Sequence, residues 1–126
     1  LDADDLLDPE KVALQLAAAG DGDAAVVYSA WEKFGTLDGR CETAAPVACR
    51  LGPDVVSDYL YCDGIATGAQ LYARRWLDRV GGWDERYPNG EDHDLALRVA
   101  FAGGRFTFVD AGRSLLFYRR HGPSLS

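Results

Sequence analysis

The sequence predicts an α/β fold in which helices flank a mixed sheet, and three observations point to it. Residues 10–19 and 91–102 are rich in helix formers and lie between start and stop signals. Residues 24–31 and 105–109 are apolar runs with the length and composition of buried strands. Strands and helices alternate along the chain, as in sheets covered by helices. A length of 126 residues fits one domain, residues 1–126.

The first helix has the clearest boundaries. Asp8 followed by Pro9 is typical of a helix start, because aspartate caps free amide groups and proline suits the first turn. Gly20 is expected to end the helix. Three apolar residues share one face, which we expect to lie on the sheet: Val12, Leu16 and Ala19.

The rest of the chain carries signals of uneven strength. Glycine and proline recur between residues 32 and 53, so we expect a loop there, with one brief strand near residues 47–51. Shorter patterns predict further elements: helices at 54–60 and 74–80, strands at 69–73 and 113–118, and a turn at 87–90.

Composition excludes several functions. The 20 acidic residues outnumber the 13 basic ones, giving a net charge of -7. That charge opposes nonspecific binding to nucleic acid or to an anionic membrane. No apolar run approaches the roughly 18 residues of a membrane-spanning helix. The three cysteines form no CxxC pair, which favours reduced thiols. We expect a cytoplasmic protein, held at the inner face of the membrane if missing parts of the parent protein attach it there.

The first candidate site is a DxD motif near the start of the sequence. Leu1 is expected to end a strand, and residues 2–5 to form the following loop. Ligands of open α/β sheets gather at the carboxyl ends of strands. Asp2 and Asp4 can converge there on a hard cation or on a ribose hydroxyl. The alternative is an acidic turn that only caps the next helix.

The second candidate site is the acidic start of the helix at 91–102. The helix dipole alone favours carboxylates in a first turn, and Asp94 with Arg98 is expected to form a surface pair. The adjacent carboxylates Glu91 and Asp92 are harder to explain as a capping device. A carboxylate at the mouth of a cleft is what a general base requires.

The third candidate site follows the last strand. Arg119 and Arg120 offer planar guanidinium groups that suit a pyrophosphate. His121 beside them is a candidate metal ligand, and the alternative is a solvated histidine near the end of the sequence. We expect His93, the other histidine, to lie on a helix surface.

Three segments carry a resemblance: LDADDLLDP, then TGAQLYARRWLDRVGGWDERYPNGEDHDLALRVAFAGG, then YRRHGPSLS. In this order they resemble the family 2 glycosyltransferases of the GT-A fold. The markers are the DxD-like loop, the small-residue pair at 67–68, the GGWDE segment at 81–85, the GED segment at 90–92 and the final Tyr-Arg with its histidine. The resemblance implies the second half of a nucleotide-diphospho-sugar transferase fold. The amino-terminal nucleotide-binding strands would be missing from this piece.

The resemblance implies a donor and metal site. Asp2 would hold the ribose of a nucleotide-sugar, and Asp4 would approach a divalent cation, Mg²⁺ or Mn²⁺. His121 would complete the environment of the metal or of the pyrophosphate, beside Arg119 and Arg120. A metal ion suits this reaction because it neutralises the charge of a diphosphate leaving group.

The resemblance also implies a catalytic centre. Asp92 would take the proton of the acceptor hydroxyl, and Glu91 would orient the acceptor or the base. Gly81, Gly82 and Trp83 would shape the pocket for the donor sugar and the acceptor. The family more often has phenylalanine or tyrosine where this chain has Trp83.

These implications define the expected function and its rivals. We expect transfer of a sugar, with inversion, to a hydroxyl of a glycan or other acceptor, as in the synthesis of cell-envelope polysaccharides. Without the missing strands this piece alone should be inactive, and its exposed sheet edge could support a homodimer. One alternative is a non-catalytic module that binds carbohydrate or nucleotide. Another is an acidic α/β domain whose carboxylates only keep it soluble.

Overall fold

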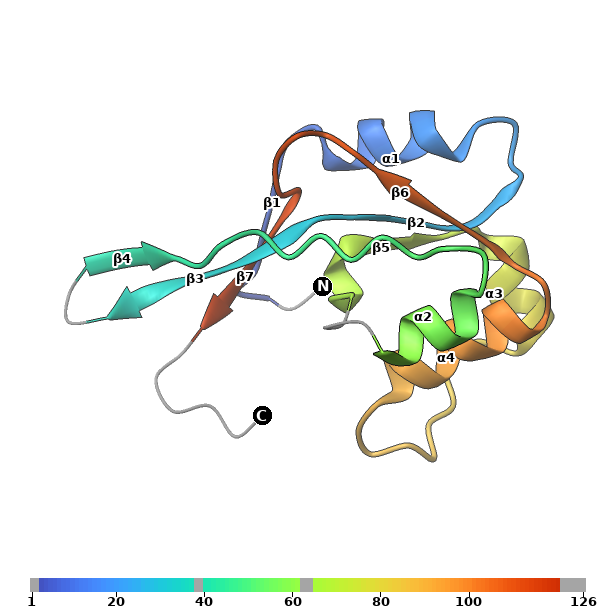
Figure 1. Cartoon of the computed structure of the whole chain (residues 1–126). Coiled ribbons are helices and arrows are strands. Elements are labelled where there is room, and N and C mark those ends of the chain that lie inside the picture. Colours follow the sequence, from blue (N-terminus) through green and yellow to red (C-terminus); the bar gives the residue numbers. More distant parts are fainter. Residues whose placement is uncertain (1–2, 38–39, 62–64, 121–126) are drawn as a thin grey trace.

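The computed structural model describes residues 3–37, 40–61 and 65–120, and it confirms a mixed α/β fold (Figure 1). A sheet with strand order β5-β2-β6 continues into a second sheet with order β1-β7-β3-β4. Their bounds are β1 Leu6–Leu7, β2 Ala24–Ser29, β3 Trp31–Leu37, β4 Arg40–Thr43, β5 Gln70–Tyr72, β6 Arg105–Val109 and β7 Leu116–Arg120.

Two long chain segments cross from one sheet to the other. Ala30 separates β2 from β3, and β6 leads into β7 after a short link. These segments run side by side, because β2 pairs with β6 and β3 pairs with β7, both in parallel. The outer pairings are antiparallel, with β5 on β2, β1 on β7 and β4 on β3. Both sheets are therefore mixed.

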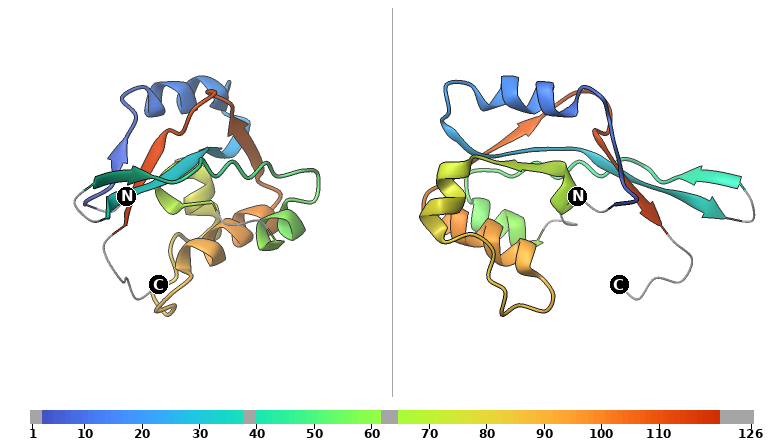
Figure 2. Two further views of the ribbon diagram at one scale, coloured as in Figure 1. Left: turned by 60° about the vertical axis from the view of Figure 1, so that its left-hand side comes forward. Right: turned by 180° about the vertical axis from the view of Figure 1, so that it is seen from behind.

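Helices cover both faces of the sheets. Helix α1 (Lys11–Ala19) lies on one face, and three helices gather on the opposite face, as both views of Figure 2 show: α2 (Val55–Tyr61), α3 (Arg74–Val80) and α4 (Glu91–Phe101). Strand β2 is buried along its whole length between these layers. Val27 packs toward α1, whereas Val26 packs against Val99 of α4.

The close approach of α4 to the central strand depends on Gly104. A Cβ atom at this position would lie 2.5 Å from Cγ1 of Val99 and 2.8 Å from Cβ of Ala25. Both distances are far inside van der Waals contact, so only glycine fits without movement of its neighbours. Gly104 therefore has a packing role at the contact between α4 and β2.

The predicted face of α1 is wrong in part. Ala19 packs near the sheet, but Val12 and Leu16 are 49% and 59% exposed. The buried positions are Lys11 and Gln15. Their polar groups are satisfied inside: Gln15 Nε2 donates to Val27 O at 3.0 Å and to Ala69 O at 2.8 Å, and Lys11 Nζ donates to Gln15 Oε1 at 2.5 Å. These hydrogen bonds, rather than the apolar pattern, set the rotation of the helix.

The helix boundaries are close to those predicted. Asp8 Oδ1 accepts the Glu10 amide at 2.9 Å, so Asp8 caps a turn that enters α1 at Lys11. Gly20 ends the helix with φ at 60°. The predicted helices at 54–60, 74–80 and 91–102 and the strands at 24–31, 69–73 and 105–109 are confirmed within about two residues at either end.

The predicted loop at 32–53 is wrong in its first half, whereas residues 44–53 form no helix or strand, as expected of a loop. Strands β3 and β4 occupy much of it, and the brief strand expected at 47–51 is reduced to a single bridge between Val47 and Trp31. Strand β3 is formed by its pairing with β7, which lies far away in the sequence, and local signals do not register such a partner. Strand β7 starts at Leu116, later than the predicted 113, and the strand expected to end at Leu1 falls outside the described residues.

No helix in the described part of the chain is long and apolar enough to span a bilayer.

Candidate active site

The carboxylate of Asp92 is fixed at the start of α4. Gly90, with φ at 77°, turns the chain into the helix, and Asp92 lies half-buried in its first turn. Thr67 Oγ1 donates a hydrogen bond to Asp92 Oδ2 at 2.6 Å, and the His93 amide donates to Oδ1 at 2.8 Å. Both carboxylate oxygens are therefore held, which fixes the plane of the group. An oriented carboxylate of this kind can accept a proton from a ligand hydroxyl.

Thr67 belongs to η1 (Thr67–Ala69), a single turn of 3-10 helix that leads into β5. The Ala69 amide donates to Ala66 O at 2.8 Å, and Ala69 is fully buried. Gln70 Nε2 donates to Ile65 O at 3.0 Å, which fastens the entry to η1. The backbone that carries Thr67 is thus anchored on both sides.

A buried polar network lies next to this turn. The hydroxyl of Tyr72 donates to Gln70 Oε1 at 2.6 Å, and Gln70 Nε2 approaches the Tyr59 hydroxyl at 3.3 Å. Burial raises the pKa of Tyr72, and the neighbouring Tyr59 and Asp92 raise it further, so its hydroxyl stays protonated. The Tyr59 ring meets the exposed His93 ring edge-on at 5.5 Å between centroids. His93 lies on the helix surface, as predicted.

A second cluster joins the DxD loop to β7. Arg119 Nε donates to the carbonyl oxygen of Asp4 at 3.0 Å, and the Arg119 amide donates to Asp5 Oδ1 at 3.0 Å. The guanidinium also stacks on Phe34, 4.5 Å from the ring centroid. Arg119 therefore holds the loop in place, while Arg120 is exposed at the end of β7.

The glycine pair Gly81-Gly82 ends α3 and is clamped by Arg98. Gly81 adopts a left-handed conformation with φ at 82°. Arg98 Nη1 donates to Val80 O at 2.6 Å and Nη2 to Gly82 O at 2.8 Å, while the same guanidinium pairs with Asp94 at 2.7 Å. The predicted surface pair of Asp94 and Arg98 is therefore partly buried, and it ties α4 to the end of α3.

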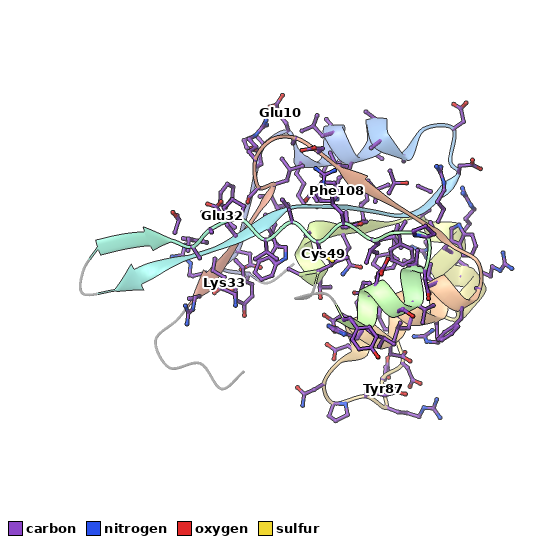
Figure 3. All side chains as sticks on the ribbon, viewed as in Figure 1. Glu10, Glu32, Lys33, Cys49, Tyr87 and Phe108 are labelled. Carbon is purple, nitrogen blue, oxygen red and sulfur yellow. The ribbon has the colours of Figure 1, made fainter. Side chains whose placement is uncertain are left out.

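The loop that follows exposes aromatic side chains. Trp83 is 46% exposed, and Figure 3 shows Tyr87 on the part of this loop farthest from the sheets. Arg86 donates to both carboxylate oxygens of Asp84, and this contact lowers the pKa of Asp84 to about 2. Glu91 is exposed beside this loop, at the first residue of α4.

The predicted metal ligands lie only partly within the described chain. Asp4 is described, but Asp2 and His121 fall outside the described residues. Within residues 3–37, 40–61 and 65–120, no three acidic, histidine or cysteine side chains are grouped to hold a metal ion. The metal site therefore stays a prediction.

Several residues of these clusters were not assigned a role from the sequence. In the sequence, Thr67 stands out only as part of a small-residue pair, and Asp5 only as one of a run of acids. Gln70 gives no signal in the sequence, because a buried glutamine looks like any polar residue until its partners are known. A polar residue inside an otherwise apolar helix, such as Gln15, is the one hint that was available.

No family model matches the chain, and no curated protein matches it either.

Proposed function

We propose that this chain is the carboxyl-terminal part of an inverting, metal-assisted glycosyltransferase of the GT-A type. The observation that carries the proposal is the 2.6 Å hydrogen bond between Thr67 and Asp92. It joins two of the markers on which the family resemblance rests, the small-residue pair at 67–68 and the GED segment at 90–92, which are 25 residues apart. It also orients the carboxylate that the resemblance implies as the base. The mixed sheet with helices on both faces supports the same proposal.

The reaction would be a single displacement at the anomeric carbon of the donor sugar. Asp92 accepts the proton of the acceptor hydroxyl as its oxygen forms a bond to the anomeric carbon. The bond from that carbon to the diphosphate oxygen breaks, and the nucleoside diphosphate leaves with the electron pair. Attack from the face opposite the leaving group inverts the configuration. Glu91, which is exposed one residue before the base, would orient the acceptor.

The donor would lie at the DxD loop. Asp4 has the hard oxygen donor that Mg²⁺ and Mn²⁺ prefer, and Arg119 fixes its loop through the Asp4 carbonyl and the Asp5 carboxylate. We assign Asp4 and His121 to the cation, Asp2 to the ribose, and Arg120 with Arg119 to the pyrophosphate side. When bound, the cation neutralises negative charge on the leaving diphosphate. Gly81, Gly82 and Trp83 would border the sugar and the acceptor.

The activity would belong to the longer chain that contains these residues. By the resemblance, the strands of the nucleobase pocket would lie before Leu1, and the described part would hold the base and one side of the donor site. A glycan or another hydroxyl compound would be the acceptor.

The test is a donor panel on the full-length protein. UDP-, GDP- and dTDP-sugars are supplied in turn with Mn²⁺ or Mg²⁺, and release of the nucleoside diphosphate is followed. We expect release from at least one donor, loss of activity with a chelator and recovery with added metal. Failure of every donor, together with calorimetric binding of sugar that needs no metal, would favour the non-catalytic binding module instead.

A further inference from the structure

We propose that Thr67 is a positioning residue that sets the orientation of the Asp92 carboxylate, and that the buried Gln15 holds the turn from which Thr67 acts. This inference rests on the proposed function, because it treats Asp92 as the base. It adds a component that the motifs do not contain: a polar connection from α1, on one face of the sheets, to the start of α4 on the other.

The contact at Asp92 decides which lone pairs remain for the acceptor. An ionised carboxylate has about four lone-pair positions on its two oxygens. Thr67 Oγ1 occupies one on Oδ2, and the His93 amide occupies one on Oδ1. One position on each oxygen is left, and its direction is set by the plane of the carboxylate. Without the hydroxyl of Thr67, the amide of His93 would be the one remaining hydrogen-bond donor to this carboxylate among the described residues.

The position of Thr67 is in turn set from α1. Gln15 is completely buried, and its Nε2 donates to Ala69 O, in the same turn as Thr67, and to Val27 O of β2. These two bonds fix η1 against the central strand. The Gln15 side chain is itself oriented, because Lys11 Nζ donates to its Oε1 at 2.5 Å. Lys11 is 4% exposed, so its ammonium group is buried, and no carboxylate among the described residues forms an ion pair with it.

Burial of a lysine and a glutamine in a helix face costs stability, and apolar residues would serve packing equally well. Nearby Val12 and Leu16 are apolar yet exposed. Gln15 therefore lies where it meets a carbonyl of η1, and Lys11 lies where it orients the Gln15 side chain, as a positioning role requires.

The test compares Thr67→Val, which keeps the shape and removes the hydroxyl, with Thr67→Ser, which keeps the hydroxyl. For Thr67→Val in the full-length protein we expect kcat to fall about tenfold to a hundredfold, with the KM for the donor unchanged. Thr67→Ser should remain within about threefold of the natural protein because it retains the hydrogen bond. Gln15→Met should lower kcat in the same way, by a smaller factor.

A second measurement uses the 126-residue chain and needs no turnover. The side-chain carboxyl carbon resonance of Asp92 should shift in Thr67→Val and stay in place in Thr67→Ser. If it is unmoved in both folded variants, or moves equally in both, the positioning role is wrong.

Asp92→Asn separates the two proposals. If Asp92→Asn abolishes transfer while Thr67→Val has normal kcat, only the positioning role fails. The same conclusion follows if Thr67→Ser loses as much activity as Thr67→Val, or if Thr67→Val raises KM alone. If Asp92→Asn transfers normally, the base assignment and the positioning role both fail.

Discussion

At the scale of single residues, the proposed function depends on the carboxylate of Asp92 at the start of α4, whose Oδ2 accepts a hydrogen bond from Thr67 Oγ1 at 2.6 Å. Asp92 was predicted from the acidic first turn and from the GED segment around it. Its partner Thr67 was not, because the bond depends on a single 3-10 turn 25 residues away, and turns of that kind leave little trace in local composition. The carboxylate was predictable, but its orientation was not.

Lys11 allows a test at the same scale that does not depend on the reaction. Burial lowers the pKa of Lys11 below that of an exposed lysine, about 10.4. At pH values between the lowered pKa of Lys11 in the folded chain and its ordinary pKa in the unfolded chain, the unfolded chain binds more protons than the folded one. The contribution of Lys11 to the free energy of unfolding therefore rises as pH increases toward 10.

Lys11→Met removes this titrating group. Urea unfolding of both chains between pH 7 and 10 should show the natural chain gaining stability relative to the variant as pH rises. Tyr72, whose pKa is raised, loses its stabilising contribution only above about pH 10 and is common to both chains. If the stabilities of the natural chain and of Lys11→Met change in parallel with pH, burial does not lower the pKa of Lys11.

At the scale of elements, α1 shows why an apolar pattern can leave the buried face undecided. Most of its residues are apolar, so more than one face could meet the sheet. Val12 and Leu16 were predicted to be buried, yet the hydrogen bonds of Gln15 turn that face to solvent. Helix ends were predicted well because glycine, proline and aspartate act locally. The rotation of α1 about its axis was not predicted, because it is set by the hydrogen bonds of Gln15 to backbone carbonyls of β2 and η1.

Two leucines of α1 test this rotation. Leu14 is half-buried and packs on the cluster around Val27, whereas Leu16 is 59% exposed. Leu14→Ala should lower the free energy of unfolding by about 1–2 kcal/mol, less than the 2–5 kcal/mol of a fully buried leucine. Leu16→Ala should stay within about 0.5 kcal/mol. Urea denaturation measures the free energy of unfolding of both variants. A larger loss in Leu16→Ala than in Leu14→Ala would mean that the face predicted from the sequence, with Leu16 buried, is the correct one.

The packing of α4 on β2 gives a second test at this scale. Gly104→Ala should destabilise the chain by about 1–3 kcal/mol, since its Cβ would overlap Val99 and Ala25. Val99→Ala removes the nearest atom. The double variant should therefore lose less stability than the sum of the two single variants. Strict additivity in thermal or urea unfolding would mean that the two sites do not touch.

At the scale of the whole molecule, the alternation of strands and helices predicted the α/β class, but not the division into two sheets. That division arises because β2 with β3, and β6 with β7, each run on from one sheet to the next. The two parallel pairings, β2 with β6 and β3 with β7, join segments that are distant in sequence. Local propensity cannot choose between such distant partners, which is why the local pattern predicts a loop where β3 lies.

The sheet edges lead to a prediction about assembly. Among the described strands, β1, β4, β5 and β6 each have a neighbour on one side only. Leu6 and Leu7 of β1 are also exposed, at 51% and 37%. Unpaired apolar edges promote pairing between chains, so we expect the isolated chain to form a dimer in light scattering. Leu6→Lys should shift it toward monomer. A natural chain that is monomeric at all concentrations would contradict this expectation.

The account as a whole depends on Asp92 as a base, and one measurement tests that most directly. Transfer by the full-length protein is compared between the natural chain and Asp92→Asn, which keeps the shape of the side chain and removes its ability to accept a proton. We predict that kcat falls by about 10²–10⁴-fold while the KM for the donor is nearly unchanged. Normal transfer by Asp92→Asn would contradict the account.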